Sequence, residues 1–197
     1  MPQKFTVSQY TSNVCFQTAM ERDQRVFLSP LGRGNDIFLG SSQTAYFIYV
    51  GRTTAPMTPQ YIESWLSVVG VGVSSVEVGL FSSPAPPKKA AQTLTKITST
   101  ATYDSLISGT GTKRNTGAAL ATLVPAGTYL WAGLKVITLG TNPTYWGLSA
   151  AMQEGYVLTT GTAGTFSDNT SWAGLIPAET GAATPPTIGP ELRVTLD

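Results

Sequence analysis

Hydrophobic and polar residues alternate with a period of two along much of the chain. The alternation is clearest at residues 76–80 and 130–136, and it recurs at residues 4–8, 146–152 and 192–197. Successive side chains of a β-strand point to opposite faces of a sheet, so each run predicts a strand with one buried face.

The alternation also predicts which side chains point inward. In the run at 130–136, Leu130 and Leu134 belong to the apolar face, while Trp131 shares the opposite face with Tyr129 and Lys135, which leaves it two positions: in the core, as one Trp per sheet often is, or pointing outward. By the same reasoning Trp146 lies on a buried face. Glu63 and Glu77 are expected to be outward-facing, solubilising carboxylates.

Turn-forming residues separate the predicted strands. They gather at residues 82–87, 108–112, 125–127, 140–143 and 161–164, and the chain contains 20 Gly and 13 Pro. Short, Thr-rich strands between frequent turns, without an amphipathic helix, are typical of an antiparallel all-β fold. The sequence therefore predicts a β-sandwich of the jelly-roll or a related Greek-key type.

The N-terminal part of the chain has a different pattern. Residues 9–40 combine a cluster of charges with little sustained alternation, whereas residues 45–50 form a strong predicted strand. Two interpretations fit residues 1–42: an arm that packs on a neighbouring subunit, or a long segment that covers a sheet edge of the same domain. The sandwich domain is assigned to residues 43–197.

Composition excludes several classes of function. Only 12% of the 197 residues are charged and the net charge is +1, so the chain lacks the excess of cations that nucleic-acid binding requires. It contains no histidine and a single cysteine, Cys15, which removes Ser-His and Cys-His nucleophile pairs and an ordinary zinc site. No apolar stretch predicts a secretory signal or a membrane helix, and we expect folding in the cytosol.

No motif predicts catalysis. A pair of carboxylates is the remaining catalytic arrangement, and the candidates carry no signature of a glycosidase; they are Glu63, Glu77, Asp104, Glu154, Asp168 and Glu179. The glycines of residues 108–113 lack the spacing of a phosphate-binding loop. We therefore expect no catalytic residue, no cofactor and no metal.

A family resemblance rests on three segments. These are VEVGLFSS at 76–83, QTLTKI at 92–97 and VPAGTYLWA at 124–132. The set resembles jelly-roll domains of tailed-bacteriophage virion proteins, which occur in tail fibres, head fibres and capsid decoration proteins. The resemblance implies a viral structural protein that is assembled in the host cytoplasm and located in the virion, where it forms a closed homo-oligomer, with a trimer favoured.

Two roles follow from this resemblance. In the first, the chain decorates the capsid, and its scarce charges make inter-subunit contacts; these are Glu21, Arg22, Asp23, Arg25, Arg33, Asp36, Lys88, Lys89, Lys113 and Arg114. In the second, a tail- or head-fibre module binds a host glycan by stacking sugars on Tyr129 and Trp131. The expected partners are the chain itself and phage capsid or tail proteins, with neither nucleic acid nor membrane.

Overall fold

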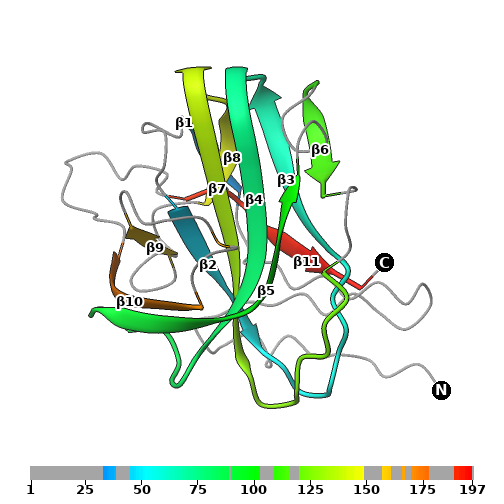
Figure 1. Ribbon diagram of the computed structural model, residues 1–197, viewed down its shortest axis with the longest axis vertical. Helices are drawn as coiled ribbons and strands as arrows, with labels where there is room; N and C mark the ends of the chain where they lie inside the picture. Colours follow the sequence, from blue (N-terminus) through cyan, green and yellow to red (C-terminus); the bar gives the residue numbers. More distant parts are fainter. Residues whose placement is uncertain are drawn as a thin grey trace.

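The computed structural model describes residues 33–38, 45–88, 90–102, 109–115, 120–148, 157–160, 166, 170–177 and 189–196. Every regular element within these ranges is a β-strand, and all of the strand pairs are antiparallel (Figure 1). The all-β antiparallel prediction is confirmed, while jelly-roll connectivity stays a prediction. The described part of the chain contains no helix with the length and apolar character needed to cross a membrane.

The strands form two layers. Six strands close into a barrel in the order β10-β5-β4-β7-β2-β9. Their bounds are Ser171–Pro177 for β10, Gln92–Thr102 for β5, Val71–Ser83 for β4, Tyr129–Thr141 for β7, Ala45–Arg52 for β2 and Val157–Thr160 for β9. The second layer contains β1 (Arg33–Phe38), β8 (Thr144–Leu148), β3 (Tyr61–Val68), β11 (Arg193–Thr195) and β6 (Gly111–Arg114).

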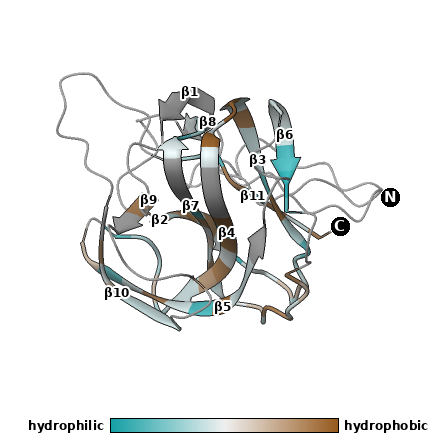
Figure 2. Ribbon diagram, turned by 45° about the horizontal axis from the view of Figure 1, so that its top comes forward, coloured by the Kyte–Doolittle hydropathy of each residue, from teal (hydrophilic) through white to brown (hydrophobic). Residues whose placement is uncertain are grey.

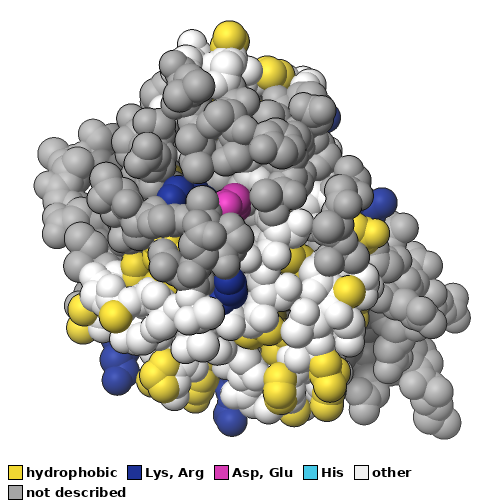
Figure 3. Space-filling view, in the orientation of Figure 1, with side chains coloured by type: hydrophobic (Ala, Val, Ile, Leu, Met, Phe, Trp, Pro, Cys, Tyr) yellow, Lys and Arg dark blue, Asp and Glu magenta, His cyan; other side chains and the backbone are white. Residues whose placement is uncertain are grey.

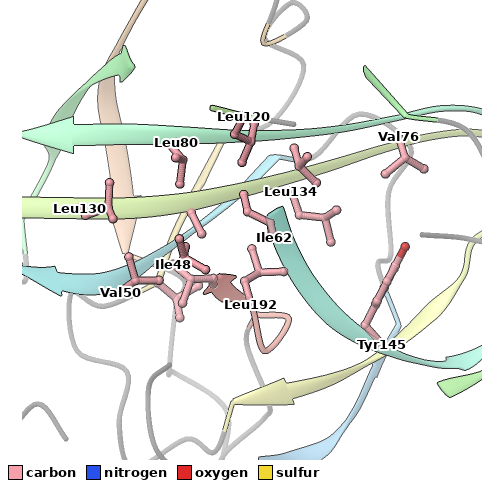
Figure 4. Packing of buried hydrophobic residues seen from close by; sticks show 14 of the residues in the cluster. Ile48, Val50, Ile62, Val76, Leu80, Leu120, Leu130, Leu134, Tyr145 and Leu192 are labelled. Carbon is pink, nitrogen blue, oxygen red and sulfur yellow. The ribbon is translucent and has the colours of Figure 1, made fainter. Parts of the chain in front are cut away.

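One hydrophobic core lies between the two layers. Figure 4 shows Ile48, Leu80 and Leu134 of the barrel wall facing side chains such as Ile62 of β3 and Leu192, which precedes β11. All five of these side chains are fully buried. Complete burial of a Leu or Ile side chain stabilises a fold by roughly 1.5–3 kcal/mol, so this core holds the layers together.

A second core fills the barrel. Phe47, Phe81, Phe166 and Trp172 pack there with tilted or edge-to-face rings, and the Phe47 and Phe81 ring centroids are 4.9 Å apart. This arrangement brings the positive edge of one ring to the negative face of the next. As a result, β4 and β7 are buried on both faces, because one face contacts the inter-layer core and the other the barrel interior.

Two glycines make room for these rings. Gly79 and Gly133 lie opposite each other on β4 and β7. A Cβ on Gly133 would lie 2.6 Å from Phe81 Cε2, and one on Gly79 would lie 2.9 Å from the same atom. The barrel interior therefore requires the absence of side chains at both positions.

The residue of β8 that faces the core differs from the predicted one. Tyr145 is fully buried and Trp146 is half-buried, which reverses the predicted inward position of Trp146. The reason is register, because Tyr145 lies opposite Leu66, a fully buried residue of β3. In the last strand Leu192 and Val194 are buried as predicted, but Thr195, which was predicted to face outward, is buried as well.

Part of the predicted N-terminal segment belongs to the second layer. Residues Arg33–Phe38 form β1, which pairs with β8 at the edge of the sheet. The assignment of residues 1–42 as an arm or as a covering segment stays a prediction, because only residues 33–38 of them are described. Residues 1–32 lie outside the described ranges, and with them the predicted strand at 4–8 and Cys15.

Candidate functional site

The turn between β3 and β4 presents an apolar surface. Val68, Val69 and Val71 are 51%, 37% and 66% exposed, and they are three of the four large hydrophobic residues that are exposed in the described ranges. We call these three residues the valine tip. Figure 2 colours the ends of β3 and β4 as hydrophobic, and Figure 3 shows hydrophobic side chains at the same end of the molecule.

Local backbone geometry shapes the valine tip. Only Val69 and Gly70 connect β3 to β4, and Gly72 has a φ of +68°, a conformation that glycine adopts without strain. Gly140 packs directly beside the turn, since a Cβ on it would lie 2.5 Å from the carbonyl oxygen of Val71. These glycines hold the valines at the end of the long β4–β7 pair.

The two chain segments that form the valine tip and its neighbouring turn carry no charged residue. Residues 68–72 and the adjoining residues 140–144 contain neither acidic nor basic side chains, and Val71 lies opposite Thr141. A contiguous patch of exposed apolar residues is typical of an interaction surface. The alternation pattern missed it, although the sequence signal was there: four valines in six residues around two glycines.

The predicted inter-subunit charges lie on separate elements. Lys88 is exposed in the loop after β4, Arg33 and Asp36 belong to β1, and Lys113 and Arg114 belong to β6. The residues that lie outside the described ranges are Glu21, Arg22, Asp23, Arg25 and Lys89. The described charges are thus not gathered into one site.

Arg114 has an intramolecular partner. Its guanidinium carbon lies 4.7 Å from the centroid of the Tyr61 ring, within the range of a cation–π interaction. Arg52 lies similarly over Tyr129, at 5.4 Å. These contacts account for two of the chain's scarce cations within a single copy.

Of the two positions left open for Trp131, the structure shows the core position. Its side chain is fully buried in the barrel, where its ring lies 5.2 Å from that of Tyr49 and its Nε1 donates a hydrogen bond of 2.9 Å to Ser83 Oγ. Tyr129 is half-buried at the start of the same strand. The predicted glycan platform of Tyr129 and Trp131 is therefore not formed, because the outward face of an ordinary sandwich is here the inside of a barrel.

The closed barrel also buries two charged groups. Glu77 and Lys135 lie opposite each other on β4 and β7, and they are only 4% and 2% exposed, so the predicted outward position of Glu77 is wrong. Glu77 Oε2 accepts a hydrogen bond of 2.7 Å from the backbone N–H of Phe166. Burial lowers the pKa of Lys135, while the negative charge of Glu77 acts to raise it.

Lys96 contacts the same backbone position. Its Nζ donates a hydrogen bond of 2.7 Å to the carbonyl oxygen of Phe166. Phe166 is thus held through its N–H by Glu77 and through its C=O by Lys96, and its ring is held in the barrel core. These charged groups position a segment of the chain.

The carboxylates considered for catalysis are not brought together in the described structure. Glu63 is half-buried on β3, whereas Glu77 is inside the barrel on another layer. The remaining candidates, Asp104, Glu154, Asp168 and Glu179, lie outside the described ranges. Among the residues that the structure describes, no group of three or more His, Cys, Asp or Glu side chains is placed to hold a metal ion.

Comparisons with protein-family models, with curated proteins and with solved structures find no match to this chain. Its function is therefore inferred from the residues and the geometry described above.

Proposed function

We propose that this chain is a non-enzymatic structural protein of a tailed-bacteriophage virion, which self-associates and decorates the capsid surface. It would assemble in the host cytoplasm from copies of itself and bind capsid or tail proteins. The proposal starts from the resemblance of segments 76–83, 92–97 and 124–132 to virion jelly-roll domains. The antiparallel all-β architecture is compatible with such a role.

The scarcity of charge supports self-association. With 12% charged residues and a net charge of +1, copies of this chain repel one another weakly. Low net charge promotes association between exposed surfaces. Few surface charges give a free monomer little electrostatic repulsion against aggregation. A subunit in an assembly needs less of this repulsion, because part of its surface is buried.

The valine tip is the observation that carries the proposal. Its three exposed valines have no charged neighbours along residues 68–72 and 140–144, so the surface is complementary to a second copy of itself. Burial of apolar area at such contacts contributes about 25 cal/mol per Å². In the ring of three that the resemblance favours, the three valine tips would meet at the symmetry axis, so that each tip packs against the other two.

The test is sedimentation velocity of the full chain and two single variants. Val71→Asp places a carboxylate in the proposed contact of every copy, and we expect it to shift the protein from the oligomer to the 20.8 kDa monomer. Leu123→Asp is the matched control, since Leu123 is 64% exposed but lies near the start of β7, at the other end of the strand from Thr141. Unchanged assembly of Val71→Asp would refute the proposed contact.

The virion assignment has its own test. In particles purified from infected cells, quantitative mass spectrometry should detect the chain at a fixed copy number relative to the major capsid protein. We expect Val71→Asp to reduce that copy number, because decoration by many subunits depends on multivalent contact. Absence of the chain from purified particles would contradict the virion assignment while leaving self-association intact.

A further inference from the structure

Three loops leave the barrel at the same end. Ser83 of β4 pairs with Tyr129 of β7, and Tyr129 pairs with Arg52 of β2, so the ends of these three strands form one row. We call Arg52 and the segments that continue from this row the loop end; the segments are residues 53–60, 84–88 and 120–128. The loop end lies at the bottom of Figure 1, opposite the valine tip.

Hydrogen bonds hold two of these loops together. Thr53 is 4% exposed, and its hydroxyl donates a hydrogen bond of 2.7 Å to the Pro125 carbonyl oxygen and accepts one of 2.9 Å from the Thr128 N–H. Met57 and Val124 exchange two backbone hydrogen bonds, of 3.0 and 2.7 Å. The loops therefore form a fixed surface, and binding to a fixed surface loses little conformational entropy.

This fixed surface presents a large apolar side chain. Leu123 is 64% exposed, and it is the large exposed hydrophobic residue of the described ranges that does not belong to the valine tip. The next residue, Val124, is fully buried and occupies the inward position, so Leu123 stays outside the core. Figure 3 shows hydrophobic side chains along this lower end of the molecule. Exposed small apolar residues of the same two loops are Ala55, Pro56, Pro125 and Ala126.

The charges of the loop end have one sign. Arg52 and Lys88 are both exposed. The Arg52 guanidinium is oriented by the Tyr129 ring, at 5.4 Å, and by a hydrogen bond of 3.2 Å from its Nε to the Gly127 carbonyl oxygen. The sequence contains no Asp or Glu in residues 52–60, 84–91 and 120–128. The loop end thus combines an exposed apolar side chain with positive charges that its own loops do not balance.

This combination determines which partner fits. Two loop ends in contact would bring like charges together, which is unfavourable, whereas the uncharged segments of the valine tip suit a second copy. Binding to an anionic membrane gains only about 1 kcal/mol per cation, and Leu123 is a single large apolar group to insert. A protein surface with carboxylates around an apolar contact complements both features of the loop end.

We propose that the loop end binds an acidic protein surface, with Leu123 in an apolar contact and carboxylates of the partner paired with Arg52 and Lys88. This proposal rests on the proposed function, in which the partner belongs to the virion. The chain would self-associate through one end of the molecule and attach to its partner through the opposite end.

Co-sedimentation with particles that lack the chain tests this proposal. Such particles are purified from an amber mutant of its gene, and the full chain is added at increasing concentrations. We expect saturable binding that weakens as NaCl is raised, because salt screens the paired charges. Leu123→Asp and Lys88→Gln should each weaken the apparent affinity by about tenfold or more, since every copy in the oligomer loses the same contact.

The matched control is Thr112→Asp. It also changes the net charge by one negative unit, but at an exposed position of β6 in the second layer, and it should bind as the unmodified chain does. Leu123→Asp should keep the oligomeric mass of the unmodified chain in sedimentation velocity, so that its loss of binding does not result from lost assembly.

Three results would overturn the proposal, and they are distinguishable. If the unmodified chain binds the particles and both loop-end variants bind equally well, the loop end is not the contact, while the virion assignment stands. If the unmodified chain does not bind the particles, the virion assignment fails and this proposal fails with it. Binding to phosphatidylserine vesicles without binding to the particles would assign the loop end to a membrane.

Discussion

Glu77 and Lys135 lie opposite each other on β4 and β7 with both side chains inside the barrel. Two opposite charges at this depth lose much of their water, and replacing one of them removes the compensating charge from the other. This relationship predicts strongly non-additive effects of substitution.

Lys135→Met should destabilise the fold by about 3–5 kcal/mol, because Glu77 would then be an uncompensated buried carboxylate. The double variant Glu77→Gln/Lys135→Met should recover much of that loss, since glutamine retains an acceptor for the Phe166 N–H. Urea denaturation of the single and double variants measures both effects. The control is Lys88→Met on an exposed lysine, and a double variant as unstable as the sum of its singles would contradict the pairing.

The burial of Tyr145 predicts that the free energy of unfolding decreases at alkaline pH. Burial raises the pKa of this fully buried phenol above its ordinary value of 10.0. Above pH 10 the unfolded chain therefore releases this proton while the folded chain keeps it, so the free energy of unfolding falls by up to about 1.4 kcal/mol per pH unit. Tyr46, whose pKa burial also raises, adds to this fall.

The comparison of the unmodified chain with Tyr145→Phe at each pH isolates this effect. Lys135 acts in the opposite direction below its ordinary pKa of 10.5, but its contribution is common to both proteins and cancels. Denaturation curves above pH 10 should show a shallower loss for Tyr145→Phe. Equal slopes in the two proteins would mean that the phenol ionises alike in the folded and unfolded chains.

Gly133 has no room for a side chain. Gly133→Ala would place its Cβ 2.6 Å from Phe81 Cε2 and 3.2 Å from Phe166 Cζ, so we expect a loss of about 1–3 kcal/mol. Adding Phe81→Leu should restore part of this stability by removing the crowded ring edge. Thermal unfolding of both variants tests the contact, and a Gly133→Ala protein as stable as the parent would show that the barrel interior is looser than described here.

We expect the Trp131 side chain to stabilise the fold. Trp131→Ala should cost about 3–5 kcal/mol, because it empties the volume of a fully buried indole. Ser83→Ala should cost about 1–3 kcal/mol by leaving the indole N–H without its acceptor. Denaturation measures both. A stable Trp131→Ala protein that loses only sugar binding would restore the predicted glycan platform and contradict this structure.

Local pattern was sufficient to predict the class of fold. The strands at 76–80 and 130–136 follow directly from alternation and are present in β4 and β7, and the apolar run at 45–50 is present in β2. Alternation predicts two faces but not what covers each face. Closure of the barrel through the pairs β9–β2 and β9–β10 covers the second face, and it is this long-range event that buries Trp131 and Glu77.

The exposed apolar surface does not follow from alternation. The valine tip leaves a local signal in residues 68–73, but consecutive valines around glycines also suit a buried strand. Exposure of that turn separates the two interpretations.

The mass of the unmodified full chain in solution tests the central claim of self-association most directly. Size-exclusion chromatography with multi-angle light scattering should give an integer multiple of 20.8 kDa that stays constant as the protein is diluted, as expected of a closed ring. A stable mass of 20.8 kDa at every concentration would contradict the structural-subunit account.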